Sequence, residues 1–272
     1  MLLTFDLDGV VMKNPFSTGV FPAVTGLIGQ ASGLSHGEIM KLIIGEAKSR
    51  MGLGNMVAAY DWDDIVNLVA GSLGYREPID VAALVRQHCT PEHIFAYPEV
   101  AETLAHLKTT PHPLLVLTNG FRKYQLPVLE ALGIAGFFDA IYTPEVNGRA
   151  KPEPEFFLEP RVHYPGLHLH IGDTIIHDIW GANEAGAKSI WIYHDLPESI
   201  AGLPLKERAE HPMMSSLVAE GIARDLNAAA YPSVTVAGAM PDYVIKTFGE
   251  LIPLLSLLQM CENRQIDRGS GP

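Results

Sequence analysis

From residue 98 to residue 193 the chain alternates short apolar runs with segments of helical periodicity. The apolar runs occupy residues 113–119, 140–143, 168–173 and 189–193, and helix-like spacing fills the stretches between them. Neighbouring parallel strands need long crossover connections, which helices usually supply. The alternation therefore predicts an α/β fold, a doubly wound, mostly parallel, Rossmann-like sheet with helices on both faces.

A block of helical texture separates the first apolar run, residues 2–11, from the others. Between about residues 22 and 89 the apolar spacing predicts helices at 35–50, 61–73 and 79–88, and no strand candidate interrupts them. Because the block follows the first strand directly, we interpret it as an insertion. We expect an α/β core of residues 1–13 and 92–272, and an α-helical cap of residues 14–91.

Residues 195–240 fit neither pattern and form an unusual insertion in the predicted core. A helix-like piece spans residues 205–230 and carries Met213, Met214, Leu217 and Val218 close together. We expect this piece to pack on the core or on a second subunit and to lie outside the active site. The strand-then-helix texture returns at residues 242–258.

The composition excludes some classes of function. A formal net charge of −12 provides no basic face for nucleic acid. No run approaches the roughly 20 apolar residues of a membrane helix, and the N-terminus lacks the features of a signal peptide. Cys89 and Cys261 lie in no metal-binding or redox spacing. A soluble cytoplasmic protein is the expectation, with no nucleic-acid or membrane partner and no prediction of oligomeric state.

Polar side chains gather where the apolar runs end: Asp6, Asp8, Thr118, Asn119 and Asp173. Ligands of parallel sheets bind beyond the carboxyl ends of the strands, so one site could collect all five. Each has a simpler explanation alone, since Asp-x-Asp recurs by chance and Thr-Asn-Gly often forms a turn. Two carboxylates ending a buried strand are costly, however, unless they are paired or bind a metal.

Lys151 and Asp178 complete a set suited to phosphoryl transfer. That reaction needs a nucleophile, a proton donor for the leaving oxygen, hydrogen-bond donors for the phosphoryl oxygens, and cations. Clustered carboxylates would repel one another unless a divalent cation joined them, and oxygen ligands suit Mg²⁺. Asp178 could also be a helix cap, and Lys151 an ordinary surface lysine.

Four ordered motifs resemble those of the haloacid dehalogenase superfamily. The similarity extends over about residues 1–13, 92–193 and 240–256, and the four-part pattern is highly specific. The motifs are Phe5-Asp6-Leu7-Asp8-Gly9-Val10, Leu117-Thr118-Asn119-Gly120, Ala150-Lys151-Pro152-Glu153-Pro154, and Ile171-Gly172-Asp173 through Asp178.

The resemblance implies a role for each matching position. Asp6 would attack phosphorus, while Asp8 would protonate the leaving oxygen and later activate water. Thr118 and Asn119 would bind phosphoryl oxygens, and Lys151 would hold both nucleophile and phosphate. Mg²⁺ would be bound by Asp6, Asp173 and the backbone carbonyl of Asp8, with Asp178 bound directly or through water. The implied enzyme is a Mg²⁺-dependent phosphatase of the superfamily, with an inserted helical cap.

Asp8 bears on the alternatives within the superfamily. Relatives that cleave carbon–halogen bonds lack an aspartate there, because halide needs no proton, which disfavours a 2-haloacid dehalogenase. A non-catalytic relative that binds a phosphorylated ligand or a protein is a further alternative. We expect the substrate to be a small phosphorylated metabolite, but the motifs do not identify which one. Lys48 and Arg50 beside Gly52-Leu53-Gly54 are the candidates to contact it, unless they are merely solvated helix charges.

Overall fold

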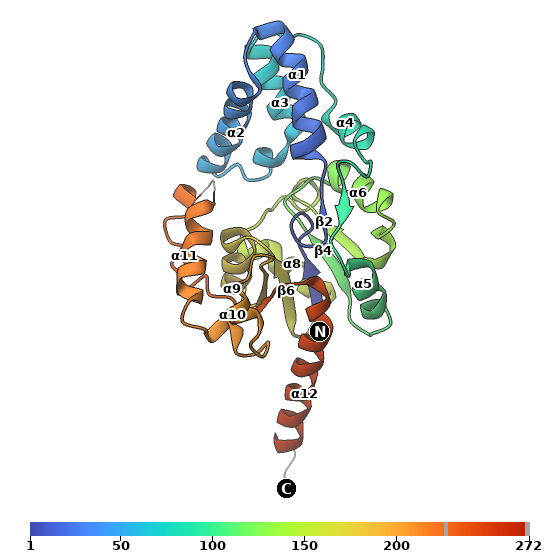
Figure 1. Cartoon of the computed structure of the whole chain (residues 1–272), viewed down its shortest axis with the longest axis vertical. Helices are drawn as coiled ribbons and strands as arrows, with labels where there is room; N and C mark the ends of the chain where they lie inside the picture. The colour runs from blue at the N-terminus through green and yellow to red at the C-terminus, as the bar shows by residue number, and fades with distance from the viewer. Residues whose placement is uncertain (226–227, 270–272) are drawn as a thin grey trace.

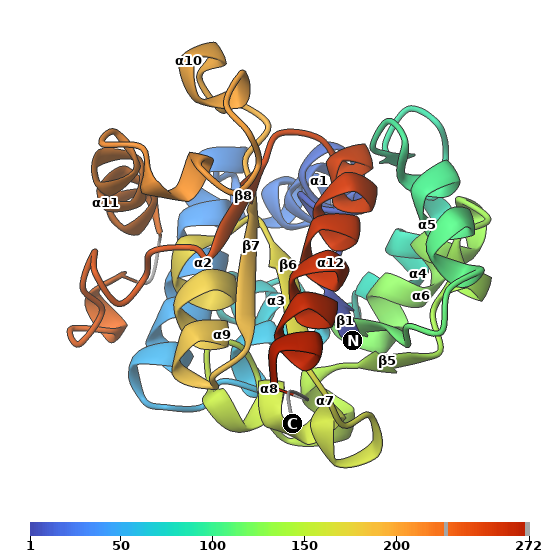
Figure 2. The same cartoon turned by 90° about the horizontal axis from the view of Figure 1, so that it is seen from below.

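A computed structural model describes residues 1–225 and 228–269, with side chains as far as residue 260. Its main sheet has six parallel strands in the order β5-β4-β1-β6-β7-β8. The first strand in sequence lies near the middle, so the chain winds outward from it in both directions (Figures 1 and 2). The strands are β1 (Leu2–Phe5), β4 (Leu114–Leu117), β5 (Ala140–Tyr142), β6 (His168–Gly172), β7 (Lys188–Ile192) and β8 (Tyr243–Ile245).

Helices cover both faces of this sheet, which confirms the predicted doubly wound α/β fold. Side chains of a strand alternate between the faces. Leu3 and Phe5 point into the larger core with α5 (Val100–Lys108), α6 (Arg122–Ala131) and α12 (Leu251–Gly269). Leu117 packs on the opposite face against α8 (Pro154–His163) and α9 (Gly181–Glu184). A short α7 (Pro144–Asn147) follows β5.

The segment between β1 and α5 is helical apart from two short strands at its base. Its helices are α1 (Phe21–Ser32), α2 (His36–Gly52), α3 (Trp62–Ser72) and α4 (Val81–Gln87), and they sit above the carboxyl end of the sheet in Figure 1. The strands β2 (Met12–Lys13) and β3 (Phe95–Ala96) pair antiparallel where the chain leaves and re-enters the core. We call residues 14–91 the helical insertion.

Local sequence explains where helices of the insertion begin. Ser35 and Glu38 form a reciprocal capping box at the start of α2. The carboxylates of Asp61 and Asp80 accept backbone N–H groups at the starts of α3 and α4. These observed starts lie within two residues of the predicted ones.

Residues 195–240 hold less helix than predicted. The expected helix 205–230 was wrong in extent: in the described residues the segment forms α10 (Glu198–Ala201), α11 (Met214–Arg224) and two short 3₁₀ turns, Arg208–Glu210 and Ala228–Ala230. Pro212 disfavours a helical conformation in the residue before it, and His211 is extended. Asp225 is extended as well and ends α11, while residues 226–227 lie outside the described part of the chain. Among the described helices, none is long and apolar enough to cross a membrane.

A buried arginine ties this segment to the core. The guanidinium of Arg208 donates two hydrogen bonds to the carboxylate of Glu250, at 2.8 and 2.9 Å, and further ones to the carbonyls of Leu203 and Ala201. The Arg208 side chain is 6% exposed. Burial alone would raise the pKa of Glu250, but the hydrogen bonds and charge of Arg208 lower it below its usual value.

We predict that Arg208→Ala lowers the free energy of unfolding by about 2–4 kcal/mol, because Glu250 and two carbonyls lose their partner together. Urea denaturation measures the change. Arg76→Ala, at an exposed position of the insertion, is the control and should change stability by less than about 0.5 kcal/mol. Equal stability of the two variants would contradict the anchoring role.

Candidate active site

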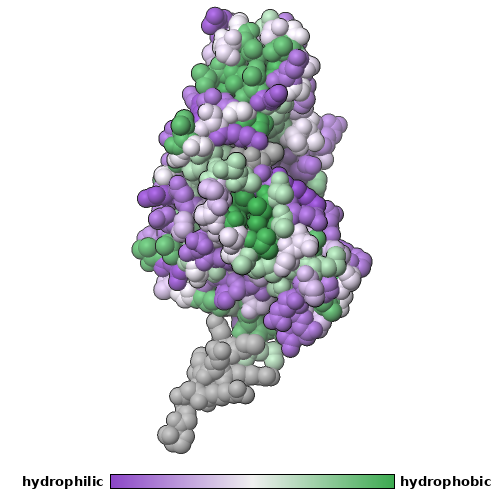
Figure 3. Space-filling view, turned by 90° about the vertical axis from the view of Figure 1, so that its left-hand side faces the viewer, coloured by the Kyte–Doolittle hydropathy of each residue, from purple (hydrophilic) through white to green (hydrophobic). Residues whose placement is uncertain are grey.

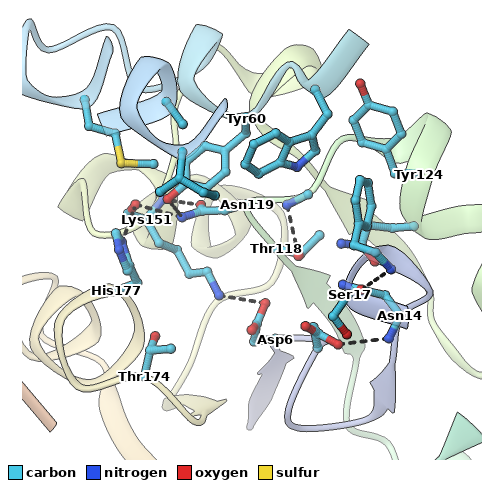
Figure 4. A pocket seen from close by; sticks show the side chains of 18 of the residues that line it. Asp6, Asn14, Ser17, Tyr60, Thr118, Asn119, Tyr124, Lys151, Thr174 and His177 are labelled. Atoms are coloured by element: carbon cyan, nitrogen blue, oxygen red, sulfur yellow. Dashed lines mark hydrogen bonds and ion pairs between the residues drawn. The ribbon is translucent and has the colours of Figure 1, made fainter. Parts of the chain in front are cut away.

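The carboxyl ends of β1 and β6 bring three carboxylates together. Asp6 follows β1, Asp173 follows β6, and Asp178 lies in the π-helical turn Ile175–Trp180. One oxygen from each lies within 4.8 Å of the other two. Asp6 and Asp173, which were expected to meet at one site although they lie about 170 positions apart in sequence, are therefore close together in the structure. Figure 4 shows Asp6 at the base of a pocket, with Lys151 and Thr118 beside it.

Lys151 is buried between two of these carboxylates. Its side chain is 2% exposed, and its Nζ lies 2.8 Å from Asp6 Oδ1 and 2.5 Å from Asp178 Oδ1. Burial alone would lower the pKa of Lys151, but the two neighbouring carboxylates raise it, so the ammonium stays charged. Lys151 therefore acts as a fixed positive charge beside Asp6, and the simpler reading of a surface lysine does not apply.

Both carboxylate oxygens of Asp178 have partners within the protein. Its Oδ1 also accepts a hydrogen bond from His170 Nε2 at 3.0 Å, and its Oδ2 accepts bonds from Thr174 N and Oγ1 at 3.0 and 2.5 Å. Burial would raise the pKa of Asp178, but Lys151 and His170 hold it well below the ordinary value. Both carboxylate oxygens are thus engaged within the protein.

A buried polar chain continues from Asp178 through the sheet. His170 Nδ1 lies 2.9 Å from Thr4 Oγ1, which lies 2.7 Å from His168 Nε2. Desolvation lowers the pKa of His168 to about 3 and lowers that of His170 as well, so both rings are neutral near pH 7. Sequence reasoning missed these residues, although two histidines alternating within a buried strand were a visible signal.

Asp173 is the residue in this cluster that the protein leaves unsatisfied. Its Oδ1 is buried and has no hydrogen-bond partner among the described residues. Burial, together with the charges of Asp178 and Asp6, raises the pKa of Asp173 well above its usual value. Burial also raises the pKa of Asp6, against the lowering effect of Lys151. A hard divalent cation would relieve both effects, so this oxygen-rich cluster fits Mg²⁺.

Gly9 allows the chain after Asp8 to pass close to this cluster. Its φ of +85° belongs to the left-handed region, and a Cβ there would lie 2.2 Å from Asp173 Oδ2. The chain turns at this point, so β1 ends at Phe5 and the predicted strand of residues 2–11 is shorter than expected. The turn carries Asp8 to the edge of the pocket.

Asp8 differs from the buried carboxylates because its side chain is open to the pocket. Its Oδ1 accepts a hydrogen bond from the backbone N–H of Asn14 at 2.9 Å. The pocket walls still exclude much of the water around the carboxyl group, and this desolvation raises the pKa of Asp8 to about 6, while the Asn14 N–H opposes the shift. Such a group can be protonated or ionised near neutral pH, which suits a general acid and base.

Asn119 positions the segment that carries Lys151. Its Oδ1 accepts a hydrogen bond from Lys151 N at 2.8 Å, and its Nδ2 donates to Lys151 O at 3.0 Å and to Tyr60 Oη at 2.8 Å. Both amide hydrogens are therefore engaged. Thr118 is 3% exposed, lines the pocket, and accepts a bond from Gly120 N at 3.3 Å.

The pocket above Asp6 has a volume of about 600 Å³ and is bounded by three parts of the chain. Lys48, a predicted substrate contact, lines this pocket. Other residues that the sequence analysis did not select as site candidates also line the pocket, and most of them lie outside the four motifs. They are Lys13, Asn14, Phe16, Ser17, Phe21, Ile44, Ala47, Met51, Tyr60, Trp62, Gly120, Tyr124, Gln125, Thr174, His177, Arg224 and Asp225.

Arg224 and Asp225 require a correction. The segment 195–240 was expected to lie outside the active site, but the end of α11 reaches the pocket, below α2 in Figure 1. Asp225 Oδ2 lies 3.6 Å from His177 Nε2, and the Tyr231 hydroxyl lies 3.4 Å from Met56 Sδ in the insertion. This segment therefore bridges the core and the insertion at the rim of the pocket.

Arg50 is not among the residues that line the pocket. Its guanidinium contacts Glu46 Oε1 at 2.8 Å, Asp64 Oδ2 at 2.7 Å and Ala58 O at 3.0 Å, within the insertion. The side chain is 13% exposed. Its partners join α2 to the start of α3, which indicates a structural role.

Comparison with known proteins places the chain in a family. Residues 1–186 match the family of haloacid dehalogenase-like hydrolases, and the chain belongs to this family. The chain is 34% identical over 115 residues to glyceraldehyde 3-phosphate phosphatase of Methanopyrus kandleri, covering 41% of this chain and 49% of the relative. It is 28% identical over 162 residues to N-acylneuraminate-9-phosphatase of Rattus norvegicus, covering 58% and 63%. The matches thus span about half to two thirds of these curated relatives.

Solved structures share the fold over nearly the whole chain. A HAD phosphatase from Thermococcus onnurineus superposes with a TM-score of 0.65 at 23% identity, covering 93% of this chain and 97% of that one. L-2-haloacid dehalogenase from Xanthobacter autotrophicus gives a TM-score of 0.57 at 17% identity, covering 94% and 99%. The fold is thus common to a phosphatase and a dehalogenase and does not separate the two activities.

We predict different effects for the two cationic residues of α2. Arg50→Ala should lower the free energy of unfolding by about 1–3 kcal/mol, because two carboxylates and a carbonyl lose their partner. Lys48→Ala should leave stability within about 0.5 kcal/mol but change the ranking of phosphorylated metabolites by kcat/KM. Urea denaturation and a substrate panel measure the two effects. If Arg50→Ala shifted the ranking without loss of stability, Arg50 would belong to the substrate site.

Proposed function

We propose that this protein is a Mg²⁺-dependent phosphatase of a small phosphorylated metabolite that acts through an aspartyl-phosphate on Asp6. The observation that carries the proposal is the pair of environments at Asp6 and Asp8. The Lys151 ammonium lies 2.8 Å from Asp6, and the exposed carboxyl group of Asp8 has a pKa of about 6. A nucleophile and a general acid therefore share one pocket, and they differ in environment as their two tasks require.

In the first step a carboxylate oxygen of Asp6 attacks phosphorus and the bond from phosphorus to the ester oxygen breaks. Lys151 opposes the rise that burial causes in the pKa of Asp6, and it supplies positive charge next to the transferring group. Asp8 gives its proton to the departing alkoxide. Thr118 is placed to donate its hydroxyl to a phosphoryl oxygen, and Asn119 contributes by holding Lys151 in place.

In the second step the carboxylate of Asp8 takes a proton from water, and the water oxygen attacks phosphorus. The bond from phosphorus to Asp6 breaks, inorganic phosphate leaves, and Asp6 is restored as a carboxylate. Asp8 thus alternates between acid and base, and this use is favoured by a pKa near the working pH.

The residues that would hold Mg²⁺ are Asp6, Asp173 and the backbone carbonyl of Asp8. The unpartnered Oδ1 of Asp173 supports this assignment. Because both oxygens of Asp178 are already engaged, we assign it to orienting Lys151 and to contact with the ion through water. When bound, the ion would neutralise charge on the phosphoryl oxygens.

The alternatives fit the site less well. A dehalogenase would have no use for an acid at Asp8, and a non-catalytic binding protein would have no need of a buried nucleophile held by Lys151. The helical insertion, as a cap over the core, together with residues 224–225, is placed to select the substrate.

We predict that hydrolysis of p-nitrophenyl phosphate is lost with EDTA and restored by Mg²⁺, because the carboxylate cluster repels the phosphate dianion without a cation. Ca²⁺, larger and less strictly octahedral, should support little activity. Steady-state release of p-nitrophenol measures the effect. Full activity after exhaustive chelation would refute the metal requirement.

We predict that Asp6→Asn abolishes turnover of every ester, because no covalent route remains. Asp8→Asn should instead give a near-stoichiometric burst of p-nitrophenol followed by slow turnover, since p-nitrophenolate leaves without a proton but water lacks its base. With alkyl phosphates the first step should slow by about 10²–10⁴-fold. Stopped-flow absorbance and intact mass, with one phosphoryl group added to Asp8→Asn, check this. Normal turnover by Asp6→Asn would overturn the nucleophile assignment.

A further inference from the structure

The walls of the pocket differ sharply in chemistry. The side formed by the strand ends carries the charged and polar groups Asp6, Asp8, Thr118 and Lys151. The side formed by the helical insertion is mostly apolar and aromatic, with Asn14, Ser17 and Lys48 as its polar residues. Its apolar and aromatic residues are Phe16, Phe21, Ile44, Ala47, Met51, Tyr60 and Trp62. A ligand that fills this pocket meets polar groups at its phosphate end and mostly apolar groups at its other end.

Three rings of the insertion form a continuous aromatic cluster along this wall. The ring centroid of Phe16 lies 5.2 Å from that of Phe21 and 6.1 Å from that of Trp62, and Phe21 and Trp62 are 5.4 Å apart. Their planes are inclined by 48° to 82°, so edges and faces alternate. Phe21 and Trp62 remain partly exposed to the pocket. A further ring can join such an arrangement edge to face.

The two tyrosines of the pocket contribute rings more than hydroxyl groups. The Tyr124 hydroxyl is bonded to Asp63, 2.9 Å from its backbone N and 3.0 Å from its Oδ2. The Tyr60 hydroxyl accepts the bond from Asn119. Figure 4 places both tyrosines on the side of the pocket away from Asp6. A leaving group rich in hydroxyls would find these partners already engaged, whereas an aromatic group would bury apolar surface.

We propose that the substrate is a phosphate monoester whose alcohol carries an aromatic ring, held against Phe16, Phe21 and Trp62 while Asp6 attacks the phosphate. The proposal rests on the proposed phosphatase function and names its substrate class. Contact between the ring of the ligand and the apolar wall of the pocket removes the surface of both from water, and the binding free energy grows with the area removed. The cavity of about 600 Å³ has room for a phosphate and one ring system.

The test compares 2-phenylethyl phosphate with ethyl phosphate. Both alcohols are similarly poor leaving groups, so the chemical step demands the same acid catalysis and the ratio of kcat/KM reports recognition of the ring. We expect wild type to favour 2-phenylethyl phosphate on the order of 100-fold, since one buried methylene alone gives about 10–200-fold. Trp62→Ala should reduce this ratio to below about 10-fold, and Phe21→Leu to an intermediate value. A ratio within one enzyme does not depend on the folded fraction.

Leu68→Ala is the matched control. Leu68 lies on α3 like Trp62 but is 53% exposed on the outer surface, and it should keep the wild-type ratio. Figure 3 shows hydrophobic residues on the surface at the top of the molecule, where Figure 1 places the helical insertion. n-Hexyl phosphate separates ring recognition from general apolar binding: a kcat/KM equal to that of 2-phenylethyl phosphate would overturn the proposal. Equal rates on ethyl and 2-phenylethyl phosphate would also overturn it, with the phosphatase function intact. No turnover of any ester would instead defeat the proposed function.

Discussion

The buried ammonium of Lys151 is the interaction on which the site is built. An isolated charge in a protein interior is very costly, so the lysine and the two carboxylates that contact it depend on one another. Asp178 in turn requires the hydrogen bonds of His170 and Thr174 to satisfy its oxygens. The polar chain from the pocket into the sheet is therefore a structural consequence of keeping a cation beside Asp6.

That arrangement leaves negative charge in excess at the strand ends. Asp6, Asp173 and Asp178 cluster within 4.8 Å, and Lys151 contacts only two of them among the described residues. The excess negative charge is evident at Asp173, whose pKa is raised and whose buried Oδ1 has no hydrogen-bond partner among the described residues. Such an excess of negative charge is the condition that a divalent cation would relieve. The overall charge of −12 does not prevent an anionic substrate from binding, because local cations reverse the field inside the cleft.

The division of labour between core and insertion follows from how each is built. Parallel strands end together, so they deliver polar residues to one small region. The helices of the insertion must bury an apolar face, and where that face meets the core it lines the pocket with Phe16, Phe21 and Trp62. The segment of α11 is held to the core by Arg208, and the end of this helix adds Arg224 to the pocket wall.

The sequence by itself determined the α/β sheet, the helical insertion and the identity of the charged residues, because strand and helix periodicities are local and the motifs lie at strand ends. Only the tertiary structure decided the partners. Lys48 and Arg50 lie two residues apart on α2, and residues at that spacing point to different sides of a helix. Arg50 contacts Asp64, whereas Lys48 lines the pocket. The place of Arg224 likewise depended on folding a long segment back over the core, for which no local pattern exists.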